Sequence, residues 1–397
     1  MSHSMLRSAA VLGLLSAVGP FTIDMYLPAM PEIGRDLAAD VASVQLTITV
    51  YFVAFGLAQL VYGPWSDQAR RRRPIFFGLT LFIAATLGCT FAPSVGTLIF
   101  CRFLQGLGAA VVMVVPRAII RDLHTGNEAT RLMALVMLVI SVSPMLAPLA
   151  GSGVIALFGW RAIFAVLCIA AVASLLLARF ALPETLRPEH RVAIHMGSLL
   201  AGAKSLLSDR MFLGLTFTGG FGMASFFVFL ASASFVYTGQ YQLSPTGFSL
   251  AFALNAIGFF AASQLAAGLG ARFGARRVVL WATAGFAAAA LTTLCLIASG
   301  FTALPVLIAG LFVGNAFLGL VIPTTMVMAL DAHGEIAGLA SSLGGTLQML
   351  AGGAVTALSG LFFDGTALPM IAAIALCALA SFLLALSVLF RRAPLGA

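Results

Sequence analysis

The sequence predicts an all-α membrane protein in which twelve transmembrane helices form two pseudo-symmetric six-helix bundles. Of its 397 residues, 61% are hydrophobic and only 9% are charged, whereas an average soluble domain is about 25% charged. Twelve apolar runs each approach the length of about 20 residues that a helix needs to cross a bilayer. A glycine-led, arginine-rich turn recurs at matching places in the two halves of the chain. These observations together indicate a duplicated membrane bundle.

The apolar runs divide six and six around the one long connection, residues 182–210. This division predicts an N-terminal bundle over 1–181, a cytoplasmic linker over 182–210 and a C-terminal bundle over 211–397. The second part of the linker has the charge and apolar spacing of a helix on the inner membrane surface. The predicted spans are 8–29, 43–65, 75–93, 96–118, 132–155, 161–181, 211–237, 246–270, 278–299, 302–329, 335–362 and 366–390.

The positive charges orient these spans. If the N-terminus is inside, all of the 21 lysines and arginines except Arg35, Arg102 and Arg161 fall on the cytoplasmic side, as the positive-inside rule requires. We therefore expect both termini to be cytoplasmic. A net charge of +8 could suggest a nucleic-acid partner, but the basic residues lie in short loops between apolar runs. Nucleic acid is not expected as a partner.

The sequence offers little for catalysis, metals or cofactors. The five cysteines lie in or beside apolar runs and show no CxxC spacing, and His190 and His195 in the linker have no third ligand spaced to join them. Nucleophile-elbow, HExxH, P-loop and dinucleotide motifs are missing. We therefore expect neither an enzyme nor a bound metal or cofactor.

The first span carries the one carboxylate that lies deep in an apolar run, Asp24. An unpaired charge in hydrocarbon costs about 2.5 to 3.5 kcal/mol on insertion scales, so a retained acid is expected to face protein or a water-filled cavity. Asp24 is interpreted as a proton or cation site, and capping or pairing at the membrane boundary is the alternative. Pro20, Pro28 and Pro31 bracket it and predict a helix that kinks and then breaks.

The fourth span carries a second buried charge, Arg102, in the run Arg102-Phe-Leu-Gln-Gly-Leu-Gly. At about 1.5 Å per residue, Asp24 and Arg102 both lie about 7 to 9 Å inside the outer edge. They could share one charge-pairing network. That network would be either a functional pair in proton transfer or a static structural pair.

Two further stretches carry glycine and proline at informative places. The turn after the second span begins at Gly63 and continues through Asp67 into four arginines, and a similar turn follows the eighth span. The fifth span contains Pro144 and Pro148 followed by Gly151. Prolines remove backbone donors and glycine permits close helix approach, so this span is expected to bend and to pack tightly against a neighbour.

Together these stretches resemble the major facilitator superfamily, and specifically its twelve-span drug:proton antiporters. The turn from Gly63 is similar to that family's signature, in which the aspartate and basic residues, here Asp67, Arg71 and Arg72, would hold helices together across the inner face. It departs from the pattern because Arg70 stands where a glycine is usual. The run from Arg102 looks like the motif with a buried arginine implicated in proton transfer. The fifth span looks like the motif that marks exporters.

Two other stretches narrow the resemblance. Asp24-Met-Tyr-Leu-Pro-Ala-Met-Pro31 and Gly159-Trp-Arg-Ala-Ile-Phe164 look like the bicyclomycin and chloramphenicol resistance subgroup (Bcr/CflA). The resemblance covers nearly the whole first half of the chain. In the second half it depends on topology and on scattered aromatic and polar positions.

A pocket for varied apolar cargo needs adaptable hydrophobic side chains and a few polar anchors. The residues that we expect to line it come from the first span and from the second half, although each of them could instead face lipid or serve helix packing. They are Tyr26, Phe221, Met223, Phe226, Phe229, Asn255, Asn315 and Gln348.

The resemblance implies a monomeric transporter of a bacterial inner membrane that exports small, mostly apolar antibiotics, of the amphenicol or bicyclomycin type, in exchange for protons. Its partners would be the drug, protons and the lipid bilayer, with Asp24 and Arg102 coupling proton movement to alternating access. An uptake symporter of the same fold for a sugar or metabolite is the closest alternative. A channel is disfavoured because rings of charge and filter-like loops are missing. A receptor or structural protein would have no evident use for a buried acid.

Overall fold

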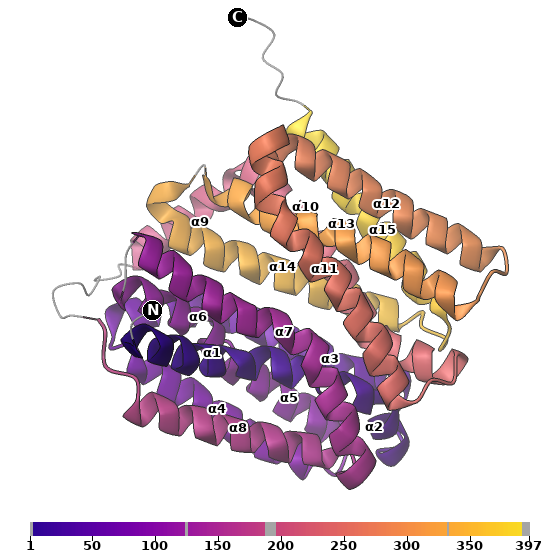
Figure 1. Ribbon diagram of the computed structural model, residues 1–397, viewed down its shortest axis with the longest axis horizontal. Coiled ribbons are helices and arrows are strands. Elements are labelled where there is room, and N and C mark those ends of the chain that lie inside the picture. The colour runs from indigo at the N-terminus through magenta and orange to yellow at the C-terminus, as the bar shows by residue number, and fades with distance from the viewer. Residues whose placement is uncertain (1–2, 124–125, 187–195, 332, 391–397) are drawn as a thin grey trace, which may run out of the picture. The chain divides into compact units, whose positions relative to one another are not determined.

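The computed structural model describes residues 3–123, 126–186, 196–331 and 333–390, and the described residues form helices without any strand (Figure 1). They divide into two compact units, Met1–His195 and Met196–Ala397. The first unit contains α1 (His3–Asp24), η1 (Leu27–Ala29), α2 (Met30–Asp36), α3 (Val41–Gln68), α4 (Arg72–Thr90), α5 (Val95–Ala109), α6 (Val111–Leu123), α7 (Gly126–Phe158) and α8 (Arg161–Phe180).

The second unit repeats this arrangement after one additional helix. Its elements are α9 (Met196–Ser208), α10 (Arg210–Phe235), the π-helical turn η3 (Val236–Gln240), α11 (Pro245–Phe273), α12 (Ala275–Ala298), α13 (Leu304–Asp331), η4 (Gly334–Ile336), α14 (Ala337–Gly360) and α15 (Ala367–Leu389).

Eleven stretches of the described chain are helical, long enough and apolar enough to cross a membrane, and they coincide with eleven of the predicted spans. The remaining predicted span is α14, which at 24 residues is long enough but owes a lower hydropathy to its glycine, serine and threonine residues. Because α14 packs along α10, these small and hydroxyl side chains can face a neighbouring helix instead of lipid.

The same helix pairs pack together in both units. In the first unit α5 packs against α3 and α4, α1 against α7, and α4 against α8. The corresponding pairs of the second unit are α13 with α11 and α12, α10 with α14, and α12 with α15. The duplication that the recurring turn predicts is therefore present in the packing of the helices.

Glycines at matching positions bring the fourth span of each unit against its second span. A Cβ added to Gly106 of α5 would come closer than 3.0 Å to the carbonyl oxygen of Tyr51 in α3. A Cβ added to Gly319 of α13 would come equally close to that of Phe259 in α11. Only glycine allows these backbones to touch, so the two contacts align the two halves residue by residue.

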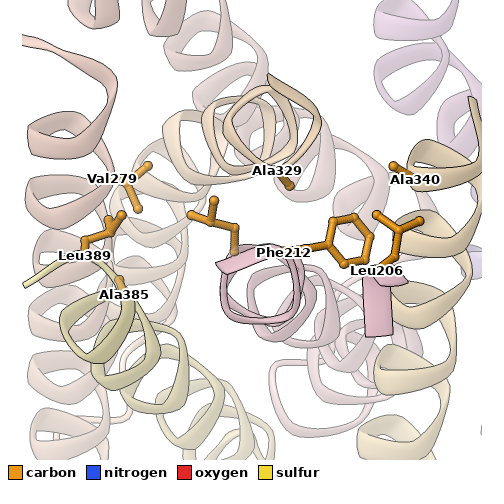
Figure 2. Packing of buried hydrophobic residues seen from close by; sticks show 8 residues of the cluster. Leu206, Phe212, Val279, Ala329, Ala340, Ala385 and Leu389 are labelled. Atoms are coloured by element: carbon orange, nitrogen blue, oxygen red, sulfur yellow. The ribbon is translucent and has the colours of Figure 1, made fainter. Parts of the chain in front are cut away.

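The helix expected in the linker is α9, but it belongs to the second unit. Leu206 of α9 is fully buried in a cluster with Phe212 of α10 and Ala340 of α14, and Figure 2 shows the Phe212 ring pointing toward Leu206. The boundary between the two units falls after His195, inside the predicted linker 182–210. Residues 187–195, with His190 and His195, lie outside the described residues.

The first span breaks where its prolines predict. Helix α1 contains Pro20 and ends at Asp24, after which the chain turns and continues as η1 and α2. Pro28 and Pro31 stand in the first turns of η1 and α2, where a helix has no use for the missing N–H. The break places the Asp24 carboxylate at the end of a helix inside the unit.

Helix α7 packs directly on this break. A Cβ added to Gly151 would come closer than 3.0 Å to the carbonyl oxygen of Met25, the residue that follows Asp24, whereas a Cβ added to Gly153 would meet open space. The close approach expected of the proline and glycine motif is therefore made at Gly151.

This difference provides a matched pair of variants. We expect Gly151→Ala to destabilise the protein by about 1–3 kcal/mol, because the added methyl group must push α7 away from the break, and Gly153→Ala to have little effect. Thermal unfolding of the purified protein in detergent measures both. Equal midpoints for the two variants would show that the contact at Met25 is unimportant for stability.

Candidate functional site

The guanidinium of Arg102 is the centre of a buried polar cluster in the first unit. Arg102 is fully buried on α5, and its Cζ atom lies 4.4 Å from the ring centroid of Tyr26 and 4.5 Å from that of Tyr51. Tyr26 stands in the break of the first span and Tyr51 on α3. The two ring faces attract the cation, and such contacts are strongest when water is excluded.

Hydrogen bonds use only part of the guanidinium. Its Nη1 donates to Gln105 Oε1 at 2.7 Å and lies 3.5 Å from the carbonyl oxygen of Thr22. Gln105 in turn donates to Thr86 Oγ1 on α4 at 2.8 Å. Nε and Nη2 of Arg102 have no hydrogen-bond partner within the described part of the chain. The guanidinium therefore has N–H groups at Nε and Nη2 that do not donate to any described residue.

The hydroxyl groups of the two tyrosines differ. Thr47 Oγ1 donates to the carbonyl oxygen of Val44, so Tyr26 must be the donor in its 2.6 Å contact with Thr47. The hydroxyl of Tyr51 is buried and has no partner among the described residues. Tyr26, which we expected to contact substrate, is itself fully buried within the first unit.

Asp24 lies beside this cluster but is not bonded to its arginine. Asp24 is 5% exposed, and Thr22 and Tyr26, which stand two residues before and after it, both contact the guanidinium. None of the ion pairs among the described residues joins Asp24 to Arg102. The expected pairing of these two charges is therefore absent in this conformation, because aromatic rings and Gln105 hold the guanidinium instead.

The equivalent place in the second unit is neutral. Arg102 precedes the contact glycine Gly106 by one helical turn, and Asn315 precedes Gly319 by the same spacing. Asn255 donates to the carbonyl oxygen of Ala251 at 2.9 Å, and Asn315 donates to Asn255 Oδ1 at 3.4 Å. The two amides, which we expected to anchor substrate, thus bond to each other inside the bundle.

A small cavity adjoins Asn315. Its volume of about 20 Å³ is enough for roughly one water molecule, far below the roughly 300–1,000 Å³ of typical ligand pockets. Helices α10, α12, α13 and α15 enclose it, and its lining includes Ser225, Phe229, Thr293 and Asn315. This cavity is too small for a drug.

The aromatic residues of α10 that we expected to line the pocket take part in packing within the second unit. The ring of Phe229 stacks on Phe252 at 5.5 Å, and that of Phe226 stacks on Phe259 at 5.9 Å, both on α11. Phe221 lies 6.5 Å from the ring of Phe217.

Two other expected pocket residues are only partly buried. Met223 on α10 is half-buried, as is Gln348 on α14, whose amide lies 3.4 Å from the carbonyl oxygen of Thr216. The structure thus brings Tyr26 to Arg102 and Asn255 to Asn315. Of the expected pocket residues of the second unit, Phe229 and Asn315 line the small cavity together, and the other five are not part of its lining.

Arg71 joins three helices at the end of the first unit that the charge pattern predicts to face the cytoplasm, which we call the inner end. Its guanidinium bonds to Asp67 at the end of α3 and makes two hydrogen bonds, at 2.8 and 3.1 Å, to Asp122 at the end of α6. Its backbone N–H donates to Glu184 Oε1 beyond α8 at 2.9 Å. Burial opposes the charge, but the hydrogen bonds and attraction from Asp122 and Asp67 outweigh it and raise the pKa of Arg71 above its ordinary value.

The other residues of this turn extend the same contacts. Gly63 accepts a hydrogen bond from Ser66 at 2.9 Å, and Ser66 accepts one from Arg71 at 3.1 Å. Arg72 donates to the carbonyl oxygen of Arg179 at 2.8 Å. The inner contacts therefore use Gly63, Asp67, Arg71 and Arg72 in the first unit.

The opposite end of the same unit, which is the predicted outer end, has its own polar contact. Trp160 Nε1 donates to Asp36 at 3.0 Å, and Arg161 forms an ion pair with the same carboxylate. Arg161 also donates to the carbonyl oxygen of Ala92 at 3.3 Å. The stretch from Gly159 thus ties the extension of the first span to α8 and to the end of α4.

Several residues of these clusters were not identified from the sequence. Tyr51 and Thr86 are ordinary members of apolar spans, and no spacing connects them to Arg102. Asp122 and Glu184 offered a signal that could have been used, since each is an acid at the predicted inner end of a span whose neighbours are basic.

The inner contacts can be tested by removing the guanidinium. We expect Arg71→Gln to lower the unfolding midpoint by several degrees, because it leaves two carboxylates without their shared partner. The loss is smaller than the roughly 3–5 kcal/mol of a fully buried broken ion pair, since both carboxylates are partly exposed. Arg73→Gln is the matched control, since Arg73 is exposed. Thermal unfolding in detergent measures both, and a midpoint for Arg71→Gln equal to that of the control would contradict the assignment.

Comparisons with known proteins agree with this geometry. A model of the Major Facilitator Superfamily matches residues 12–243. The chain is 36% identical over 369 residues to the MFS-type transporter YdgK of Bacillus subtilis, covering 92% of this chain and 91% of the relative. It is 30% identical over 375 residues to a bicyclomycin resistance protein homolog of Haemophilus influenzae, covering 94% and 93%.

A solved structure shares the fold. The D-xylose-proton symporter superposes with a TM-score of 0.78 over 96% of this chain and 97% of the other, although only 14% of the residues are identical. That likeness concerns the fold alone. From the family model and the relatives together, the chain is a transporter rather than an enzyme, and it belongs to the major facilitator superfamily, within the bicyclomycin and chloramphenicol resistance (Bcr/CflA) subgroup.

Proposed function

We propose that this protein exports small, mostly apolar antibiotics in exchange for protons, by alternating access. The observation that carries the proposal is the burial of Asp24 at the break of the first span, between Thr22 and Tyr26, which both contact Arg102. An acid kept in an apolar span at a cost of about 2.5 to 3.5 kcal/mol is retained for a function or for a partner. The described ion pairs supply no such partner.

The spare donors of Arg102 support a role for Asp24 in coupling. A carboxylate can accept hydrogen bonds from Nε and Nη2, which have none from described residues, whereas a protonated acid gains much less from a cation. Loss of the proton therefore favours movement of the Asp24 carboxylate toward Arg102. Protonation of Asp24 favours its movement away from Arg102. The turn after Asp24 and the close contact of α7 at Met25 connect such a movement to the packing of the helices.

In the proposed cycle, deprotonated Asp24 favours the drug-loaded state that is open to the cytoplasm. Protonation from outside favours drug release. One elementary charge crossing the membrane gains about 2.3 kcal/mol per 100 mV, which sustains more than a tenfold gradient of a neutral compound. One proton per cycle is therefore sufficient.

The substrate class and the setting belong to the same proposal. A relative is named for bicyclomycin resistance, and the sequence resemblance adds amphenicols. The placement of the basic residues supports an orientation with both termini in the cytoplasm of a bacterial inner membrane. Each chain carries its own acid and arginine cluster, so we propose that the monomer is the transporting unit.

The central test is the Asp24→Asn variant in inside-out membrane vesicles. Transport of bicyclomycin and of a panel of amphenicols into these vesicles is measured. We expect drug-triggered proton release and accumulation above equilibrium to be lost, because the amide cannot exchange a proton. Asp40→Asn is the control, since Asp40 is exposed and its side chain caps no helix N–H. Coupled transport at normal rates in Asp24→Asn would exclude this acid, and proton-driven movement of drug out of the vesicle lumen by the unaltered protein would indicate uptake symport.

Arg102 is tested by two substitutions that separate charge from shape. We expect Arg102→Lys to retain reduced transport, because the ammonium keeps the charge but loses the planar group that lies between the two rings. Arg102→Ala should lower the rate of coupled transport by at least tenfold. The measurement is the initial rate of drug-dependent proton flux per folded protein, and full retention in both variants would make Arg102 a structural residue only.

A further inference from the structure

Two tyrosines flank one guanidinium, yet only one has its hydroxyl group engaged. Tyr26 and Tyr51 lie at almost equal distances from Arg102, and both are fully buried. The hydroxyl of Tyr26 donates a hydrogen bond to Thr47 Oγ1. The hydroxyl of Tyr51 has no hydrogen-bond partner in the described ranges, although leaving a buried hydroxyl without a bond is unfavourable. The cost suggests that Tyr51 finds its partner in another state of the site.

The charges around the two rings indicate that partner. Thr22 and Tyr26, which stand two residues before and after Asp24, both contact the guanidinium of Arg102, so the buried acid lies near the same charge that the ring of Tyr51 covers. Of the two tyrosines on this guanidinium, Tyr51 is the one whose hydroxyl is not already engaged by another described residue. A phenol can donate to a carboxylate, and such charge-assisted hydrogen bonds are the strong ones.

The backbone and ring of Tyr51 are held in place. Its carbonyl oxygen is pressed against Gly106 of α5. Its ring lies 6.1 Å from that of Phe52 in an edge contact and 6.1 Å from that of Phe55 in a stacked one. These contacts fix the position of the Tyr51 ring. The carboxyl group of Asp24 lies at a break in its helix, so it is the group that moves to form the hydrogen bond.

We infer that Tyr51 is a positioning residue for proton coupling: its hydroxyl donates a hydrogen bond, directly or through one water molecule, to deprotonated Asp24 and holds the carboxylate beside Arg102. The inference depends on the proposed function, since it specifies how the same acid is held after it loses its proton. No covalent bond changes in this step. The proton of Asp24 leaves, and the phenol keeps its own.

Other titratable groups do not replace Tyr51 in this role. Cys89 on α4 interacts with Tyr26 and Arg102, and Cys101 on α5 interacts with Cys89. Helices α6, α7 and α8 also pack against the first span or its neighbours. Their described charged side chains are Arg117, Asp122, Glu128, Arg131, Arg161 and Arg179, and none has a described interaction with Asp24.

The test is the pH dependence of drug-triggered proton release by the detergent-purified full-length protein, with chloramphenicol as the probe. Release requires a protonated acid, so its amplitude falls as the pH rises through a midpoint. We expect Tyr51→Phe to move this midpoint upward by about one pH unit, because the hydroxyl no longer favours the carboxylate over the acid. The variant should fold normally, since the ring remains and the hydroxyl has no described bond to lose.

Two controls make the result specific. Tyr26→Phe removes the other hydroxyl beside the same guanidinium and should leave the midpoint unchanged, whatever its effect on the rate. Tyr62→Phe removes a buried hydroxyl at the inner end of α3 and should behave like the unaltered protein. A midpoint shift in Tyr51→Phe alone supports the inference. An unshifted midpoint in Tyr51→Phe, or an equal shift in Tyr26→Phe, overturns it.

Failure of the inference is distinguishable from failure of the proposed function. If Asp24→Asn abolishes drug-triggered release while Tyr51→Phe keeps the normal midpoint, Asp24 remains the coupling acid and only the role of Tyr51 is lost. If Asp24→Asn still releases protons normally, the proposed function fails, and the role of Tyr51 fails with it.

Discussion

The first unit is organised by the need to keep the guanidinium of Arg102 charged in an apolar setting. An ionised group in hydrocarbon must obtain its stabilisation from protein, and Arg102 obtains it from two aromatic faces and a glutamine. These partners require the break of the first span, helix α3 and helix α5 to meet at one point. The close contact between Gly106 and Tyr51 makes that meeting possible. The glycine, the break and the tyrosines thus serve one electrostatic requirement.

Duplication preserved the scaffold and allowed the chemistry of the two units to differ. Gly106 and Gly319 make equivalent backbone contacts, yet one helical turn earlier the first unit has Arg102 and the second has Asn315. Asn315 is satisfied by a neutral neighbour, Asn255, and is 7% exposed. A neutral amide pair has a much smaller desolvation cost than a charge, so the second unit needs no aromatic cage. This asymmetry agrees with a cycle in which one unit exchanges the proton.

The ends of the first unit follow a different physical rule from its interior. Around Arg71 the carboxylates of Asp67 and Asp122 are partly exposed while the guanidinium is buried. Solvent therefore screens the attraction between these charges only in part. The pair of Asp36 with Arg161 is more exposed on both sides, and exposed ion pairs contribute about 0–1 kcal/mol. The inner contacts should therefore matter more for stability than the outer ones.

The sequence by itself determined the spans, the break of the first span, the buried charges and the duplication. Hydropathy, proline and glycine act locally, so these features could be predicted without knowing which helices touch. Only the tertiary structure decided that Arg102 lies between Tyr26 and Tyr51 instead of pairing with Asp24, that Asn255 bonds to Asn315, and that α9 joins the second unit. Helices that are apolar on every side show no stripe that marks the buried face. Their contacts depend on how whole helix surfaces fit, and that information is not contained in the periodicity of one chain.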